Sequence, residues 1–98
     1  MTRVHAYADD VLQELDAVGL VEAYQQGLAI PDVIEAAIAR VQAVDEKLGA
    51  VAHEAFDRAR SEARSPRPGF FAGVPSFLKD NVDVAGMPTQ HGSDAFVA

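Results

Sequence analysis

A short apolar run that ends in a lysine is the feature that most constrains what this chain can fold into. The run occupies residues 73–78, begins with a glycine, and is followed directly by Lys79. Acidic, glycine and proline residues come next, which predicts a buried strand that leads into a structured loop. Because the burial looks continuous rather than alternating, this strand needs neighbours on both sides and cover on both faces. The sequence therefore predicts the beginning of a larger α/β domain, with a second short strand over residues 48–52.

Lys79 is the leading candidate for a functional residue. A lysine at the end of a buried strand is costly to desolvate, so part of it can be a neutral amine that acts as a base. The alternative is a solvated lysine paired with Asp80 or Asp83, and perturbed lysines are the minority in proteins. A base also needs a hydroxyl nucleophile within hydrogen-bond reach, and no neighbouring residue identifies it. Ser76 is predicted to lie inside the strand, and Ser93 follows a glycine in a turn.

Apolar residues recur at helical spacing before this run, and they predict a helical arm over residues 1–64. An aspartate at position 9 or 10 can cap a first short helical stretch and Asp16 a second, and Gly27 is suited to end the second. Pro31 is favoured in a first helical turn, and the apolar stripe over residues 34–48 is the most regular in the chain. The predicted helices cover residues 11–15, 17–26, 31–46 and 54–63.

A cluster of prolines and glycine separates this arm from the apolar run. Residues 65–69 read Ser-Pro-Arg-Pro-Gly, a sequence that cannot continue a helix. The single predicted domain piece, residues 1–98, is thus divided into a helical arm (1–64), a linker (65–72) and a strand with its lysine loop (73–98).

The chain is acidic, which limits its partners. Lys and Arg number 8 and Asp and Glu 15, for a net charge of −7. This charge repels phosphate backbones and anionic lipids, so we expect neither nucleic acid nor a membrane as partner and leave a homo-oligomer open. The absence of cysteine fits a reducing compartment, the first ten residues do not form a secretory signal, and no apolar run has membrane-spanning length. We therefore expect a cytoplasmic protein.

No metal or cofactor site is predicted. The three histidines, at positions 5, 53 and 91, are far apart and form no H-x-x-H pattern. Residues 80–84 look superficially like a calcium loop, but Val82 and Val84 stand where oxygen ligands are required. The glycines match neither a phosphate loop nor a dinucleotide fingerprint. The sequence therefore favours chemistry carried by side chains.

Residues 71–93, which read FAGVPSFLKDNVDVAGMPTQHGS, closely resemble the amidase signature family. That family has a G-[IV]-P-x-x-[LIV]-K-D-N-[IV] run, then a G-x-P-T turn and a Gly-Ser pair. The segments 15–21 and 34–41 also look like its N-terminal arm, so the likeness covers most of the chain. The resemblance implies the N-terminal portion of an α/β fold, in which a helical arm and the first strands belong to a mixed sheet covered by helices. It also favours the interpretation of Lys79 as a functional base over that of a solvated, ion-paired lysine.

The resemblance implies hydrolysis of a carboxamide C–N bond in a small-molecule substrate by a Ser-cisSer-Lys triad through an acyl-serine intermediate, without a cofactor. Lys79 matches the triad lysine, whereas Ser76 and Ser93 match neither serine. In the family both serines lie in a later Gly-Gly-Ser-Ser-Gly-Gly type segment, and this chain ends before it, so we expect the 98 residues alone to be inactive. Two departures are Ile30, where a capping serine is common, and His91, where a small residue is common. The alternative is a truncated remnant or non-enzymatic module that pairs through residues 34–48.

Overall fold

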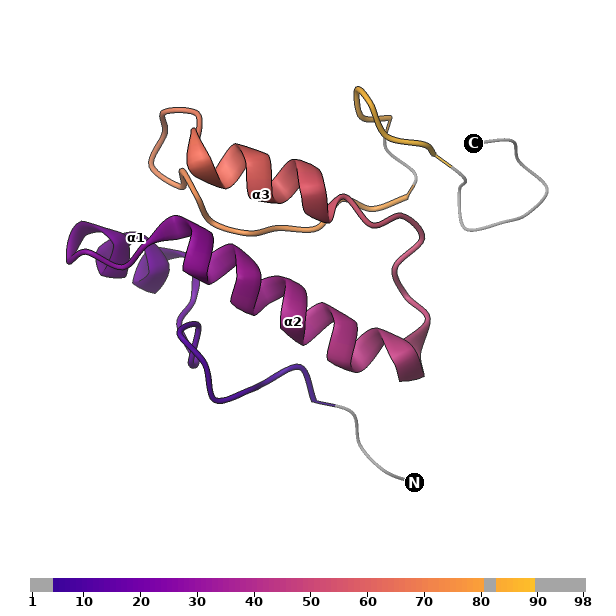
Figure 1. Cartoon of the computed structure of the whole chain (residues 1–98), viewed down its shortest axis with the longest axis horizontal. Helices are drawn as coiled ribbons and strands as arrows, with labels where there is room; N and C mark the ends of the chain where they lie inside the picture. Colours follow the sequence, from indigo (N-terminus) through magenta and orange to yellow (C-terminus); the bar gives the residue numbers. More distant parts are fainter. Residues whose placement is uncertain (1–4, 81–82, 90–98) are drawn as a thin grey trace.

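The computed structural model describes residues 5–80 and 83–89, and in that part of the chain three helices account for all regular secondary structure. Figure 1 shows α3 lying alongside α2, with α1 beside the N-terminal end of α2. The helices are α1 (Ala17–Gln25), α2 (Ile30–Leu48) and α3 (Phe56–Arg64). The predicted helices at 17–26, 31–46 and 54–63 are therefore confirmed, with ends displaced by one or two residues.

Both ends of α1 follow the signals in its sequence. The Asp16 carboxylate accepts a hydrogen bond from the Gly19 amide at 2.7 Å, which satisfies one of the free donors of the first turn. At the other end Gly27 adopts a φ of +107°, a conformation that glycine reaches without steric cost. The Leu28 amide then donates to the Ala23 carbonyl at 3.0 Å, as in a Schellman motif.

The longest helix, α2, has a proline in its first turn and ends at a glycine. Asp32 lies in the first turn and Lys47 in the last. Each charge is opposite in sign to the nearby end of the helix dipole and therefore stabilises the helix. Gly49 caps the helix in the left-handed conformation with a φ of +59°. The Asp45 carboxylate next accepts hydrogen bonds from the Ala50 and Val51 amides at 2.7 and 3.0 Å. These bonds turn the chain toward α3.

The hydrophobic core consists of two small clusters that meet along α2. One cluster is shared with α1 and with Leu12, which precedes α1, and Val74 packs against it from the segment after the linker. The other lies between α2 and α3, where Phe56 and Ala59 of α3 add half-buried contacts. The buried members are Leu12, Leu20 and Val33 in the first cluster and Ile34, Ile38 and Ala63 in the second. Removing each large aliphatic side chain from water contributes about 1.5–3 kcal/mol.

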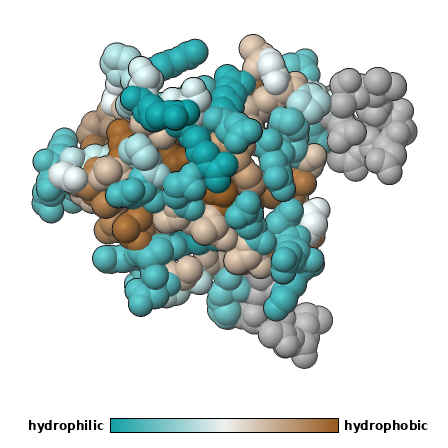
Figure 2. Space-filling model, viewed as in Figure 1, coloured by the Kyte–Doolittle hydropathy of each residue, from teal (hydrophilic) through white to brown (hydrophobic). Residues whose placement is uncertain are grey.

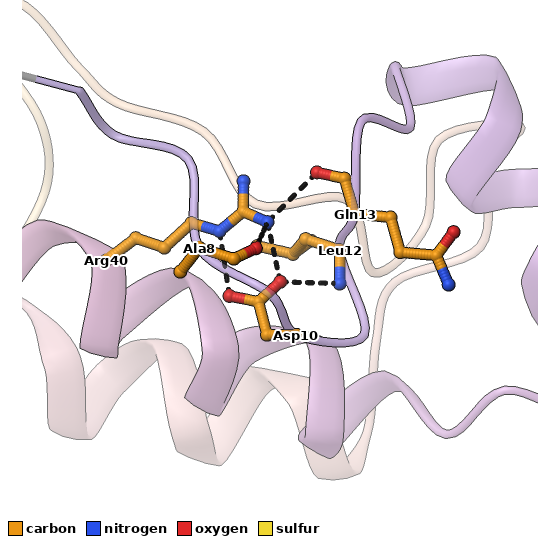
Figure 3. Close-up of polar contacts among 5 residues, drawn as sticks. All are labelled: Ala8, Asp10, Leu12, Gln13 and Arg40. Atoms are coloured by element: carbon orange, nitrogen blue, oxygen red, sulfur yellow. Dashed lines mark hydrogen bonds and ion pairs between the residues drawn. The ribbon is translucent and has the colours of Figure 1, made fainter.

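Arg40 of α2 fixes the segment that precedes α1, as Figure 3 shows. Its guanidinium donates to both carboxylate oxygens of Asp10, at 2.8 and 2.6 Å, and to the carbonyls of Ala8 and Gln13, each at 2.9 Å. The same group lies 5.3 Å from the centre of the Tyr7 ring. The hydrogen bond from Arg40 holds the pKa of Asp10 below its ordinary value of 3.8. An irregular segment is thereby held by one side chain.

Three predicted elements are absent from the described part of the chain. Residues 11–15 form turns rather than a helix, since Arg40 and the Asp10 carboxylate bind their backbone in a non-helical shape. Residues 48–52 form the end of α2 and a bend that Asp45 stabilises. Residues 73–78 form no strand, because the described segments beside them are helices and none of the described residues forms a strand that could pair with them. The predicted first strands of a mixed sheet, and with them the α/β class for this chain, are therefore wrong.

The surface is polar over much of the face shown in Figure 2, with apolar residues gathered on the side where α1 lies. Within the described residues, none of the helices combines the length and the apolar character that crossing a bilayer requires.

Candidate active site around Lys79

Lys79 lies at the exposed end of an irregular segment that crosses the helical arm. Phe77 is 74% exposed and Leu78 is 60% exposed, so the prediction of a buried approach to Lys79 is wrong for this chain. Ser76, predicted to be a core hydroxyl, is exposed as well, and its Oγ donates to the Phe77 carbonyl at 3.4 Å. The sequence identified the apolar character correctly, but nothing within the described residues covers it.

The segment is attached to the arm six residues before Lys79. The Tyr24 hydroxyl of α1 donates a hydrogen bond to the Gly73 carbonyl at 2.6 Å. Burial raises the pKa of Tyr24 above its ordinary value of 10.0, so the hydroxyl keeps its proton at neutral pH. Gly73 has a φ of +83°, and a Cβ placed on it would lie 2.7 Å from the Ile30 Cδ1 atom. Only glycine therefore fits here without a movement of the Ile30 side chain and without backbone strain.

A second attachment lies six residues after Lys79. The Arg58 Nη1 atom of α3 donates to the Ala85 carbonyl at 2.7 Å, while its Nε atom donates to Glu62 at 3.1 Å. Gly86 follows with a φ of +80°, and the Met87 amide closes the turn onto the Val84 carbonyl at 3.1 Å. Side chains of two different helices thus hold the backbone on the two sides of Lys79.

Sequence patterns did not reveal either attachment. In the sequence, periodicity marks Tyr24 only as a member of the apolar stripe of its helix, and it gives Arg58 no role beyond that of a surface cation on α3. A hydroxyl or guanidinium that binds a distant carbonyl leaves no periodic signal, since its partner is backbone and can have any side chain. The glycine at position 73 is the one hint, because a glycine at the start of an apolar run often marks a close backbone approach.

The other predicted site residues are only partly placed. Asp83 is exposed and Asp80 is half-buried. His91 and Ser93 lie outside the described residues. Among the described residues, no group of three or more His, Asp or Glu side chains gathers in a way that could hold a metal ion.

Two open hollows lie on the surface of the described residues, away from Lys79. The larger, about 400 Å³, lies at the start of α3, where His53, Glu54 and Arg58 face Met87. The smaller, about 240 Å³, lies between α2 and α3 beside the ion pair of Glu35 with Arg60. The hydrogen bond from Arg60 lowers the pKa of Glu35, so this exposed pair stays charged at neutral pH. The smaller hollow lies within the helical arm, the larger lies between the arm and residues 86–87, and Lys79 lines neither of them.

Known proteins resemble this chain over nearly its full length. A family model described as Amidase matches residues 32–98. A protein of Mycobacterium leprae (strain TN) named as an amidase, AmiC, is 57% identical over 98 residues, which are 99% of this chain and 21% of that protein. AmiC of Mycobacterium tuberculosis is 54% identical over 99 residues, covering 98% of this chain and 21% of the relative.

A more distant relative carries a different name. A protein of Anaeromyxobacter sp. (strain K) named as part of a glutamyl-tRNA(Gln) amidotransferase is 37% identical over 93 residues, covering 83% of this chain and 19% of that protein. The chain thus spans about a fifth of the length of the curated relatives it matches. No solved structure matches it.

Proposed function

This chain belongs to the amidase family, and we propose that it supplies the general-base lysine, Lys79, of an enzyme that hydrolyses a small-molecule carboxamide. The main support is that the family match over residues 32–98 includes the G-V-P-x-x-L-K-D-N-V run, in which Lys79 is the lysine. The position of Lys79 supports this role, since an exposed amine on a segment fixed at Gly73 and Ala85 is accessible to groups from outside the chain. The two serines of the triad would come from polypeptide beyond these 98 residues.

The proposed reaction proceeds in two steps. In the first, the neutral amine of Lys79 accepts a proton, relayed by a middle serine, from the nucleophilic serine. The serine oxygen attacks the amide carbonyl carbon, and the C–N bond breaks as the leaving nitrogen takes up the proton. In the second, water attacks the acyl-serine with the same base assistance and releases the carboxylic acid. Lys79 must be neutral when it acts, because an ammonium group has no lone pair to accept a proton.

The test requires a polypeptide of the relatives' length. We define the family-length chimera as the Mycobacterium leprae relative with these 98 residues in place of its matching segment. A fluorophosphonate probe reports an activated serine without knowledge of the amide substrate, because it phosphonylates the nucleophile directly. We expect the unmutated chimera to be labelled and Lys79→Ala to be labelled at least about 100-fold more slowly, since general-base assistance contributes about 10²–10⁴-fold.

The chain provides its own control, because Lys47 is its only other lysine. Lys47 is exposed in the last turn of α2, so Lys47→Ala removes the same charge and is expected to leave labelling within about twofold. An unmutated chimera that is not labelled would contradict the acyl-serine proposal. Labelling of Lys79→Ala at the rate of Lys47→Ala would overturn the role of Lys79.

We further expect the 98-residue chain by itself to remain unlabelled. Its four serines, at positions 61, 65, 76 and 93, include no adjacent pair in a glycine-rich segment. Without a nucleophile beside the base and without donors for the oxyanion, the steps that produce acceleration are missing. Specific labelling of this chain at one serine would contradict the proposal.

The alternative of a non-enzymatic module that pairs through residues 34–48 has less support. Ile34 and Ile38 of that stripe are buried inside the chain against Ala63 of α3, and they are not available to a partner. Leu48, at the end of the stripe, is 57% exposed. The enzyme is therefore the better proposal.

A further inference from the structure

We propose that Tyr24 is a positioning residue for Lys79, whose hydroxyl fixes the backbone at Gly73 and thereby sets where the lysine stands relative to the serines. The inference rests on the proposed function of Lys79. It assigns a catalytic consequence to a side chain in α1, a helix that neither carries nor contacts the reacting groups in the proposed mechanism.

The first support is the contact itself. Tyr24 and Gly73 are 49 residues apart in sequence, and the hydroxyl reaches the carbonyl at 2.6 Å, at the short end of the normal range. The Tyr24 ring packs against the first core cluster, so the donor is carried by the most buried part of the arm. The hydroxyl is therefore a fixed point and not a mobile surface group.

The second support is the geometry on the other side of the bond. Gly73 lies against the Ile30 side chain with no room for a Cβ, and Val74 packs against the same core cluster as Tyr24. The backbone is thus fixed by a hydrogen bond, a close approach and an apolar contact within two residues. The chain becomes exposed from Ser76 onward and continues to Lys79, so the fixed positions before the lysine are Gly73, which Tyr24 binds, and its neighbour Val74.

The third support is that Lys79 lacks burial of its own in this chain. Its two preceding neighbours, Phe77 and Leu78, are more than half exposed. Orientation of the segment therefore depends on its attachments, at Tyr24 before the lysine and at Arg58 after it. Because a base must be held within hydrogen-bond reach of its proton donor, a displacement of about 1 Å at such an attachment can reduce the rate by up to about 100-fold.

The experiment compares Tyr24→Phe with Tyr7→Phe in the family-length chimera. Tyr7 is the only other tyrosine, is 54% exposed, and its ring stays under the Arg40 guanidinium in either form. The readouts are the maximal rate of fluorophosphonate labelling, the probe concentration at half-maximal rate, and the melting temperature. We expect Tyr24→Phe to lower the maximal rate about tenfold with an unchanged half-maximal concentration, and Tyr7→Phe to change neither.

A purely structural role gives a different result. If Tyr24→Phe lowers the melting temperature but labels at the unmutated rate well below that temperature, the positioning role is overturned. A tenfold loss shared by Tyr7→Phe would also overturn it, because the loss would then not depend on the Gly73 contact.

Lys79→Ala in the same series separates this inference from the proposed function. Normal labelling of Lys79→Ala would overturn the proposed function of Lys79 itself. Loss of labelling in Lys79→Ala together with full labelling of Tyr24→Phe would leave the function standing and reject only the role of Tyr24.

Discussion

Two regions of the chain contain similar apolar residues but differ in how far these are buried. One is the face between α2 and α3, and the other is the segment that leads to Lys79. In the first region, Ile34 and Ile38 are 8% and 5% exposed because α3 lies directly against them. In the second, Phe77 and Leu78 are 74% and 60% exposed. An apolar side chain is thus more stable when buried, but it is buried only where another element of the chain packs against it. Within residues 5–80 and 83–89, α2 and α3 cover each other's apolar side chains, whereas Phe77 and Leu78 have no comparable cover.

The largest expected effect is the loss of stability when one apolar side chain in each region is truncated to alanine. Ile38→Ala removes buried atoms and leaves a cavity, so we expect the free energy of unfolding of the 98-residue chain to fall by about 2–4 kcal/mol. Phe77→Ala removes a larger side chain that is already in water, and we expect a change within about 0.5 kcal/mol. Urea unfolding followed by circular dichroism measures both.

A small domain could lose its fold altogether when Ile38 is truncated to alanine. Ile38→Val then serves as the milder variant, with an expected loss of about 0.5–1.5 kcal/mol. Equal losses for Phe77→Ala and Ile38→Val would show that Phe77 is covered within the chain, and the contrast between the regions would be lost.

A second, smaller loss of stability is expected at Gly73, where the lysine segment is attached to the helical arm. Gly73→Ala puts a Cβ into the Ile30 side chain and forces alanine into a positive φ, which costs about 1–2 kcal/mol for the backbone alone. Adding Ile30→Val removes the Cδ1 atom that lies nearest to the new Cβ, so the double variant should recover part of the loss. No recovery in urea unfolding would indicate that backbone strain, and not the close approach, dominates at Gly73.

The smallest effect concerns acid stability of the arm. Since the pKa of Asp10 is lower in the folded chain than its ordinary 3.8, its contribution is present above pH 3.8 and is lost as the pH falls through the folded value. Asp10→Asn should therefore flatten the dependence of unfolding free energy on pH in this acid range. Glu35→Gln should flatten it less, because the Glu35–Arg60 pair is more exposed. A steeper acid dependence in Asp10→Asn would contradict the assigned contact with Arg40.

Local signals predicted the helices well because caps and apolar periodicity act within a few residues. Asp16, Gly27 and Pro31 stand where the sequence expected them, at or near helix ends. The predicted strand over 73–78 is wrong for a different reason, since a strand exists only when another strand pairs with it, and none of the described residues forms one. The attachment of Gly73 by Tyr24 was equally invisible to pattern, because it joins a side chain to distant backbone.

The family could be identified from the sequence because its lysine motif is local, whereas the serines proposed to complete the site match no residue of this chain. The motif lies within ten residues, 73–82, and needs no tertiary information. The surroundings of Lys79 could not be predicted in the same way, because they depend on contacts between residues far apart in sequence. The 98 residues cover about a fifth of the length of the relatives they match.

Amide hydrogen exchange of the 98-residue chain tests the central contrast most directly. We predict slow exchange for the amides of Val33 and Ile38 in α2, because they open only when the arm unfolds. We predict exchange close to the rate of an unfolded peptide for Phe77 and Leu78, because they belong to no helix or strand. Protection of Phe77 and Leu78 comparable to that of α2 would mean that the strand forms within the chain, and would contradict the account.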